Sequence, residues 1–311
     1  MINSLGKVSL VINTKNEEKN ITPCINSAKS FVDEVILVDM NSSDKTVIRA
    51  KNLGAKTYRV KNYGFVEPAR NYAISKASSE WIFLLDAYER STPDLNKKLK
   101  KFASKNKYDV IFIPRKNIIL KKWFRHTAWW PDYQPRFFKK KAIRWPDIIH
   151  AHPNIKGKIY TLPANSKNAL IHNNYKNIDQ LLKKVISYTN FARNFDLKKI
   201  RSLNEILLYI EGEFSFRFIE SEGYKDGIHG FIMSKFMEFN RFLEVVRSWE
   251  KIKYSDIFAK QNLKNEYINR HPSQLIIEKL QTDLNKIQSS KFYKLWQFYC
   301  NIRDALFNRH V

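Results

Sequence analysis

Short apolar runs alternate with amphipathic segments over the first ninety residues of this chain. Three runs have the length of a buried strand, at residues 8–12, 34–38 and 81–85. Apolar side chains three to four residues apart predict a helix over residues 16–31. A capping motif at residues 43–46 predicts a second helix that ends near Gly54, and residues 64–76 are expected to form a third. Strands that alternate with helices form parallel pairs with right-handed crossovers. The pattern therefore predicts an α/β fold with a mainly parallel sheet flanked by helices.

Acidic side chains follow the second and third runs directly. Asp39 and Asp44 come after the second run, and Asp86 and Glu89 come after the third. Open α/β sheets bind their ligands at the carboxyl ends of parallel strands, so these positions predict a binding site. An isolated Asp at such a position more often caps the turn or helix that follows it. Capping therefore stays open as the alternative for Asp39 and Asp86.

The order and spacing of several motifs resemble the family 2 glycosyltransferases, and within them the lipopolysaccharide-core glucosyltransferase branch. The motifs lie at residues 16–18, 34–46, 69–71, 81–89, 129–136, 150–153, 171–175 and 223–230. Together they span roughly residues 5 to 250, and each is weak when taken alone. The resemblance implies a GT-A fold, a Rossmann-like sheet with flanking helices, followed by a helical C-terminal extension.

The resemblance also implies a nucleotide-sugar donor that lies across the carboxyl edge of the sheet. Asn16, Glu17 and Asp39 would hold its base and ribose, because carboxylate and amide groups bond to ring N–H groups and hydroxyls. Arg70 would face the diphosphate, whose oxygens suit a planar guanidinium. Asp86 begins the Asp-x-Asp motif of the family, which binds a divalent metal, Mn²⁺ or Mg²⁺, that bridges the diphosphate.

Two residues depart from the family pattern. Tyr88 replaces the expected metal-binding Asp, and a neutral phenol is a poor ligand for a hard cation, so Asp86 and Glu89 are left as candidate metal ligands. Ala151 replaces a Glu that would be the general base of the transfer. The nearby groups that could take its place are Asp147, His150, His152 and Asp132.

The segment around residues 123–135 is rich in aromatic side chains and contains two prolines. Its aromatic residues are Trp123, Phe124, Trp129, Trp130 and Tyr133. Such side chains either fill a core or form a platform that faces an acceptor. His150 and His152 are not accompanied by a Cys/His set with zinc spacing, which favours a structural or acceptor-side role for both.

The resemblance implies an enzyme that transfers a hexose, with inversion, from a nucleotide-sugar to a cell-envelope glycan or glycolipid, as in lipopolysaccharide biosynthesis. The donor would be UDP-linked. Tyr88 and Ala151 support a different function, an accessory protein without activity that binds the donor or a partner transferase. A weaker third hypothesis is a transferase that modifies a peptide.

After Asp147 the strand pattern is expected to give way to helices, over residues 177–194, 203–219 and 227–249. A further helical period runs from Leu275 to Ile287. Residues 291–299 mix lysines with aromatic side chains, as helices at a bilayer surface or an oligomer contact do. We therefore expect a catalytic domain at 1–176, a helical region at 177–250 that packs on it or closes the acceptor side, and a basic aromatic tail at 251–311.

The formal net charge is +25, spread over several basic clusters. Nucleic-acid motifs do not accompany this charge, so an anionic membrane surface is the favoured partner, and a lysine-rich composition without function is the alternative. The tail could also bind a second copy or a partner transferase. With two cysteines far apart, no apolar run of about 18 residues and no signal peptide, the sequence predicts a cytoplasmic protein peripheral to the inner face of the membrane.

Overall fold

The computed structural model describes residues 6–64, 66–146, 152–189 and 195–290, together with Lys294 and Gln297. The chain forms two compact units, and each is described by itself. The first contains Met1–Arg193 and Glu213–Glu244, and the second contains Asn194–Gly212 and Val245–Val311. The expected division into a catalytic domain, a helical region and a tail, with boundaries at 176 and 250, stays a prediction. The two units are defined by how the chain packs, and not by what each part does.

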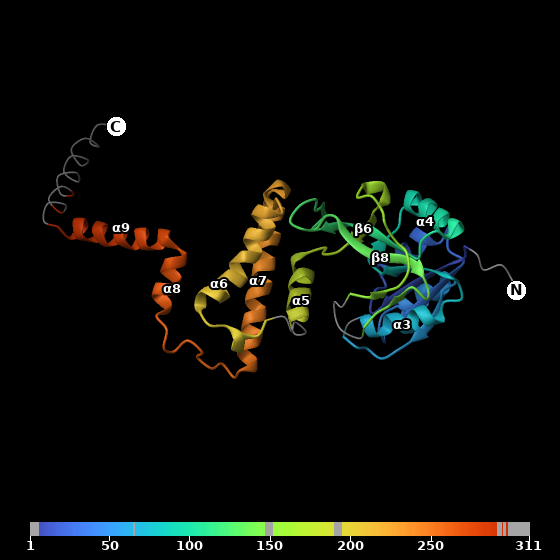
Figure 1. The fold of residues 1–311 in the computed structure, drawn as a ribbon, viewed down its shortest axis with the longest axis horizontal. Helices are drawn as coiled ribbons and strands as arrows, with labels where there is room; N and C mark the ends of the chain where they lie inside the picture. The colour runs from blue at the N-terminus through green and yellow to red at the C-terminus, as the bar shows by residue number, and fades with distance from the viewer. Residues whose placement is uncertain are drawn as a thin grey trace, which may run out of the picture. The chain divides into compact units, whose positions relative to one another are not determined.

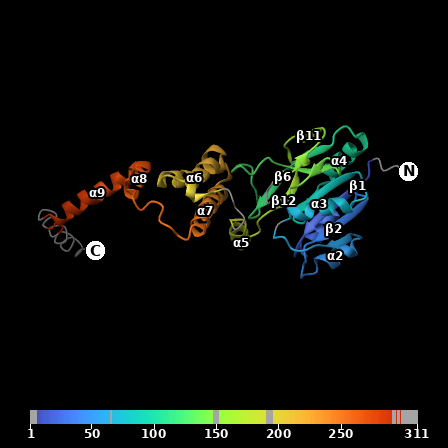
Figure 2. The same cartoon turned by 60° about the horizontal axis from the view of Figure 1, so that its bottom comes forward.

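The first half of the sheet in the first unit is parallel. Figure 1 shows the whole ribbon, and Figure 2 labels two of these strands. Strand β1 (Val8–Thr14) lies between β2 (Glu34–Asp39) and β4 (Trp81–Asp86), and β3 (Lys56–Arg59) pairs with the outer side of β2. The register places Thr14 beside Asp39 and Asn13 beside Asp86. The connecting helices are α1 (Ile21–Ala28), α2 (Thr46–Asn52) and α3 (Glu67–Lys76). The predicted parallel α/β pattern is therefore confirmed, with each helix shorter than expected.

The second half of the sheet is mixed. Antiparallel β8 (Asp132–Lys139) joins β4 to the long strand β6 (Val110–Ile119). The shorter strands bound to this half are β5 (Glu89–Arg90), β7 (Lys122–Trp123), β11 (Ile159–Thr161) and β12 (Leu170–Asn173). A separate hairpin pairs β9 (Ile143–Arg144) with β10 (Asn154–Ile155). The expectation that strands end at Asp147 is wrong, because β12 pairs with both β6 and β5 inside the main sheet.

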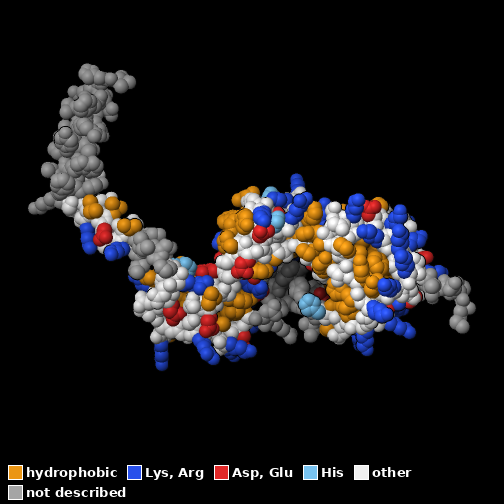
Figure 3. All heavy atoms as spheres, turned by 45° about the horizontal axis from the view of Figure 1, so that its top comes forward, with side chains coloured by type: hydrophobic (Ala, Val, Ile, Leu, Met, Phe, Trp, Pro, Cys, Tyr) orange, Lys and Arg blue, Asp and Glu red, His pale blue; other side chains and the backbone are white. Residues whose placement is uncertain are grey.

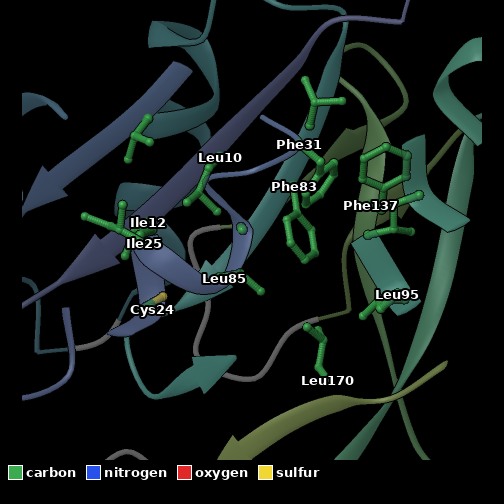
Figure 4. Packing of buried hydrophobic residues seen from close by; sticks show 14 of the residues in the cluster. Leu10, Ile12, Cys24, Ile25, Phe31, Phe83, Leu85, Leu95, Phe137 and Leu170 are labelled. Atoms are coloured by element: carbon green, nitrogen blue, oxygen red, sulfur yellow. The ribbon is translucent and has the colours of Figure 1, made fainter. Parts of the chain in front are cut away.

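Helices cover both faces of the sheet, which gives three layers (Figure 2). Alternate residues of β1 point to opposite faces, as the two-residue period of a strand requires. Leu10 and Ile12 join the cluster with Cys24 of α1 and Leu95 of α4 (Pro93–Lys105), as Figure 4 shows, whereas Val11 joins the cluster with α3. Because β1 is buried on both faces, its carboxyl end is held rigidly.

A second group of helices completes the first unit. In α5 (Ile178–Thr189), Leu181 and Val185 are buried with Tyr175, and the same cluster contains Met233 of α7 (Ile228–Lys251). Before α7 the chain forms a π-helical turn, η3 (Phe216–Glu220), and a 3₁₀ turn, η4 (Gly223–Asp226). The 3₁₀ turn η1 (Ser166–Asn168) precedes β12. Because Leu181 and Val185 are buried, the orientation of α5 about its own axis is set by this cluster.

The second unit is helical. It contains the 3₁₀ turn η2 (Leu197–Lys199), most of α6 (Leu203–Ser215), the end of α7, α8 (Leu263–Arg270) and α9 (Pro272–Ser289). Its small core joins Phe195, Leu197 and Val245, and Arg270 forms an ion pair of 2.9 Å with Glu211. The helix expected around Leu275 is therefore present as α9, and the stretch expected at 291–299 lies outside the described residues except for Lys294 and Gln297.

The basic residues do not gather in one patch on the face that Figure 3 shows, where Lys and Arg side chains lie among hydrophobic ones. In the described part of the chain, every helix is too short or too polar to cross a bilayer.

Candidate functional site

The loops after β1 and β2 are tied together by side chains that sequence reasoning had selected. The backbone N–H of Asn16 donates to Ser42 Oγ at 2.8 Å, and its side-chain oxygen accepts from the N–H of Ser43 at 2.8 Å. The N–H of Glu17 donates to Thr46 Oγ1 at 2.8 Å. Asn16 has a left-handed backbone with φ of 54°, which Asn tolerates better than most residues. The two loops therefore form one firm edge.

Asp39 ends β2, and its carboxylate caps the turn that follows. One oxygen accepts from the N–H of Ser42 at 3.0 Å, and the exposed Arg59 lies 3.7 Å away. The residue is 1% exposed and is not among the described residues that line the hollows below. The capping alternative for Asp39 is thus present in the structure, and its contact with the base stays a prediction.

Two adjoining hollows lie along the carboxyl edge of β1 and β4. The larger, the transfer hollow, has a volume of about 610 Å³ and is lined by Arg70, Asp86, Trp129, Tyr133 and other residues. The smaller, the nucleotide hollow, has a volume of about 310 Å³ and is lined by Asn16, Glu17, Asp44 and Gln180 among others. Three residues, Tyr88, Asn174 and Lys184, line both. The two hollows therefore meet at these three side chains.

Two carboxylates below the transfer hollow are held by arginines. Asp86 lies 3.4 Å from Arg70 and also pairs with Arg136. Glu89 lies 2.9 Å from Arg136 and 3.3 Å from Arg115, and its second oxygen accepts from the N–H of Asp86 at 3.0 Å. Burial alone would raise the pKa of Asp86, but the neighbouring Arg136 and Arg70 lower it below the usual range. We call this group the arginine cluster.

The arginine cluster extends to three further polar side chains. Asp132 lies 2.6 Å from Arg115 and accepts from Asn117 at 3.1 Å, and Asn117 also bonds to the ring of His172. Burial would raise the pKa of Asp132, but Arg115 and the hydrogen bonds it accepts lower it. Burial and the charge of Arg115 hold the pKa of His172 well below 6.5. Asp132 is therefore a weak base, and its candidate catalytic role stays a prediction.

The remaining base candidates are placed only in part. Asp147, His150 and Ala151 lie outside the described residues. His152 and His172 both line the transfer hollow. The lowered pKa of His172 makes it a weaker base than an ordinary histidine. His172 lies within a motif that carries the family resemblance, but nothing in the sequence singled it out.

The arginine cluster does not fit a divalent metal. Arginine side chains engage the carboxylates of Asp86 and Glu89, and Tyr88 brings no third carboxylate. Among the described residues, no three His, Cys, Asp or Glu side chains are grouped as a metal site would need. Arg70, Arg115 and Arg136 already pair with Asp86, Glu89 and Asp132, so a metal would have to displace an arginine to reach a carboxylate oxygen.

Tyr88 and Lys184 meet at the junction of the hollows. The ammonium group of Lys184 lies 4.7 Å from the ring centre of Tyr88 and 5.2 Å from that of Tyr175. Tyr88 also lies beside His172, with ring centres 5.2 Å apart. Burial lowers the pKa of Lys184, while the charges of Glu17 and Asp86 act to raise it. No sequence signal selected Lys184, because it is one of many lysines in an amphipathic helix.

The aromatic side chains of residues 123–135 lie in different surroundings, and the platform that faces an acceptor stays a prediction. Phe124 is fully buried in the cluster that anchors α5. Trp129 and Tyr133 line the transfer hollow. Trp123 packs edge-on against Trp130, with ring centres 5.3 Å apart, and stacks under Arg125. The segment therefore supplies both core and hollow.

Comparison with known proteins adds the family. Residues 9–159 match the model described as Glycosyl transferase family 2. Residues 9–159 are therefore similar to a family 2 glycosyltransferase domain. The matched residues run from β1 to the start of β11, which includes Asp39, Arg70 and Asp86 and the sheet edge beside both hollows. This domain and the mostly parallel sheet with flanking helices identify the fold as GT-A, as the sequence predicted.

The glycosyltransferase has relatives over most of its length. It is 28% identical to an uncharacterized glycosyltransferase of Rickettsia bellii over 282 residues, which cover 86% of this chain and 94% of the relative. It is 28% identical to another from Rickettsia conorii, with 85% and 96% covered. The S. aureus TarS structure with UDP-GlcNAc covers 79% of this chain and 92% of its own at 16% identity, with a TM-score of 0.44. That TM-score is too low to support an inference about ligand or reaction.

The match and the Rickettsia relatives place the protein among the glycosyltransferases. The lipopolysaccharide-core branch expected from the motifs is not among these findings, and it stays a prediction. The enzyme class is thereby confirmed at the level of the family, without the identity of the sugar.

Proposed function

We propose that the protein transfers a hexose from a UDP-sugar, with inversion, to a glycan or glycolipid of the cell envelope. The observation that carries the proposal is the pair of joined hollows at the carboxyl edge of a family 2 domain. A nucleotide-sugar has two ends of different chemistry joined by a diphosphate. The two hollows, which meet at a lysine, match that division.

Each hollow offers groups suited to one end of the donor. Glu17 and Asn16 in the nucleotide hollow can bond to base N–H groups and ribose hydroxyls. Trp129 and Tyr133 in the transfer hollow offer aromatic faces, on which a sugar ring can pack. In the reaction the acceptor oxygen bonds to the anomeric carbon, the bond from that carbon to the diphosphate breaks, and a base takes the acceptor proton. His152 and His172 are the described imidazoles that line the transfer hollow.

A panel of nucleotide-sugars tests this function. The purified protein would be incubated with UDP-glucose, UDP-GlcNAc and GDP-mannose together with membrane lipid and glycan extracts, and released nucleoside diphosphate would be measured. We expect release from a UDP-sugar that rises with the extract, and an anomeric configuration opposite to that of the donor in the product. No release with any donor and extract would refute the transferase.

The accessory role is the second candidate, because Tyr88 and Ala151 replace two carboxylates of the family pattern. It predicts donor binding without release in the same panel. Calorimetry with UDP-glucose separates the two candidates, since only the transferase gives both binding and release. The peptide-modifying transferase is a weaker proposal, and transfer to a peptide in place of the extracts would support it.

We also propose that the protein works at the cytoplasmic face of an anionic membrane. Large apolar side chains are exposed where η3, η4 and α7 meet: Phe216, Ile219, Tyr224, Ile228 and Phe231. Tyr224 and Phe231 both pack on Phe218, at 6.3 and 5.8 Å, so they belong to one patch. A net charge of +25 would add attraction to anionic lipids. The tail beyond 290, as a contact for a second copy or a partner transferase, stays a prediction.

Vesicle sedimentation with matched variants tests the membrane proposal. Ile228 is 65% exposed in the patch, and Ile48 is 61% exposed on α2. We expect Ile228→Ser to reduce binding to phosphatidylglycerol vesicles several-fold, and Ile48→Ser to leave it unchanged. Equal effects of the two variants, or equal binding to phosphatidylcholine, would exclude this patch as an anionic membrane contact.

A further inference from the structure

Lys184 differs from the arginines around it in having no carboxylate partner. Arg70, Arg115 and Arg136 each form an ion pair with Asp86, Glu89 or Asp132. Among the described residues, no carboxylate oxygen lies within 4.0 Å of the Lys184 ammonium, which rests on two tyrosine rings. A half-buried ammonium that lacks a carboxylate partner can bind an anionic ligand without first breaking an ion pair.

The position of Lys184 is fixed by the packing of its helix. Leu181 and Val185, one turn and one residue away, are buried against Tyr175 and Met233. With these two residues buried, Lys184 lies on the side of α5 that faces Tyr88, just after the carboxyl end of β4. Lys184 therefore lines both hollows.

A second cation faces the same space. Arg70 lines the transfer hollow, its contact with Asp86 is 3.4 Å long, and its Nε atom is buried without a hydrogen-bond partner. A guanidinium that is only loosely paired can also bind a phosphate oxygen. Lys184 and Arg70 are therefore two cations of the cleft that can bind an anion, Lys184 without breaking an ion pair and Arg70 through its unpartnered Nε atom.

We propose that Lys184, assisted by Arg70, binds the diphosphate of the nucleotide-sugar directly and takes the place of a divalent metal. The inference rests on the proposed function for the nature of the ligand. When the bond from the sugar carbon to the diphosphate oxygen breaks, the electron pair stays on that oxygen. The ammonium at the junction of the hollows stabilises the negative charge that develops there.

The departure at position 88 follows from this assignment. A carboxylate at the position of Tyr88 would lie next to Lys184 and neutralise it by an ion pair. The tyrosine ring instead supports the ammonium at 4.7 Å and leaves its charge available. Tyr88 and Lys184 therefore form one matched arrangement for binding an anion without a metal.

Calorimetry in EDTA with two probes tests the assignment. Pyrophosphate reports the diphosphate site alone, and UDP-glucose reports the whole donor site. The variants are Lys184→Ala, Lys184→Arg and the matched control Lys183→Ala, which removes an exposed lysine from the neighbouring position of α5. We expect both probes to bind without metal, Lys184→Ala to weaken both about 10- to 100-fold, and Lys184→Arg to retain most of the binding.

The outcomes separate this inference from the proposed function. Lys184-dependent pyrophosphate binding without binding of any nucleotide-sugar would uphold the diphosphate site and overturn the function. UDP-glucose binding that requires Mn²⁺ or Mg²⁺, or that is equally strong in Lys184→Ala, would uphold the function and overturn the inference. Equal losses in Lys183→Ala and Lys184→Ala would overturn the inference as well, since they would show only an effect of total charge.

Discussion

The cations of the cleft belong to two regions that differ in how their charge is balanced. Arg136, below the transfer hollow, has a side chain that is 4% exposed and pairs with Asp86 and Glu89. Lys184, at the junction of the hollows, is half-buried and faces aromatic rings without a paired carboxylate. A cation whose charge is neutralised inside the protein supports the fold, whereas one left unbalanced at a hollow is available to a ligand. The difference separates structural from ligand-binding charge within a single site.

The largest expected effect is on the structural side of this comparison. Arg136→Ala would leave the buried carboxylates of Asp86 and Glu89 without their shared partner, and we expect a loss of about 3–5 kcal/mol in the free energy of unfolding. Urea denaturation measures it, with Arg144→Ala, an exposed arginine of β9, as the control. If both variants lost the same amount, the arginine cluster would not be the structural element inferred here.

The pH dependence of pyrophosphate binding tests whether the charge of Lys184 binds the ligand. Lys184 is charged below its pKa, and burial lowers that pKa below 10.5, so the charge and the bound anion are lost at a lower pH than for an exposed lysine. Glu17 and Asp86 act to raise this pKa, and Arg115 acts to lower it. We expect pyrophosphate affinity to fall about 10- to 100-fold, or about 1.4–2.8 kcal/mol, as the pH rises from about 8 towards 10.5. Lys184→Arg should keep its affinity over this range, and a parallel decline in that variant would contradict the assignment.

A double variant at positions 88 and 184 tests whether a metal can replace the Lys184 ammonium. In a Lys184→Ala background, Tyr88→Asp removes the ammonium and supplies a carboxylate, which would give Asp86 a partner for metal binding. We expect UDP-glucose to bind this double variant about tenfold more tightly with Mn²⁺ than with EDTA, or about 1.4 kcal/mol. Lys184→Ala alone should show no such gain. A double variant indifferent to Mn²⁺ would mean that Asp86 stays engaged by its arginines.

The smallest expected effect is on stability at Lys184. Since no ion pair of Lys184 with a described residue is broken, Lys184→Ala should change the free energy of unfolding by no more than about 0.5 kcal/mol, in contrast to Arg136→Ala. The same urea titration measures both variants. A loss at Lys184 close to that at Arg136 would erase the distinction between structural and ligand-binding charge.

The parallel half of the sheet could be predicted from the sequence, because its information is local. Each of β1, β2 and β4 is apolar at most of its positions, since a strand buried on both faces favours apolar residues throughout. Once the strands are predicted, the acidic residues that directly follow them are placed at the carboxyl edge of the sheet. The mixed half was harder to predict: β12 has four residues and carries His172 and Asn173, so it lacks an apolar run, and the sheet was expected to end earlier.

The candidate site shows the same division between local and distant information. Asp86 and Glu89 were selected because they follow a strand, and Asn16, Glu17 and Arg70 because they match motifs of a family. Their ion-pair partners come from β6 and β8, and Lys184 comes from a helix nearly a hundred residues after Tyr88. A lysine in an amphipathic helix looks alike in sequence whether it faces water or a hollow, so its role could not be read beforehand.

The sequence by itself determined the α/β class, the strands with acidic ends and the similarity of residues 9–159 to family 2 glycosyltransferases. Those features depend on side-chain periodicity and on short motifs, which act over a few residues. The tertiary structure alone decided that arginines neutralise Asp86 and Glu89, and that Tyr88 supports an ammonium group at the junction of two hollows. Charge balance in a buried site depends on which distant segments pack together, because electrostatic energies at short range and low dielectric are set by geometry and not by order along the chain.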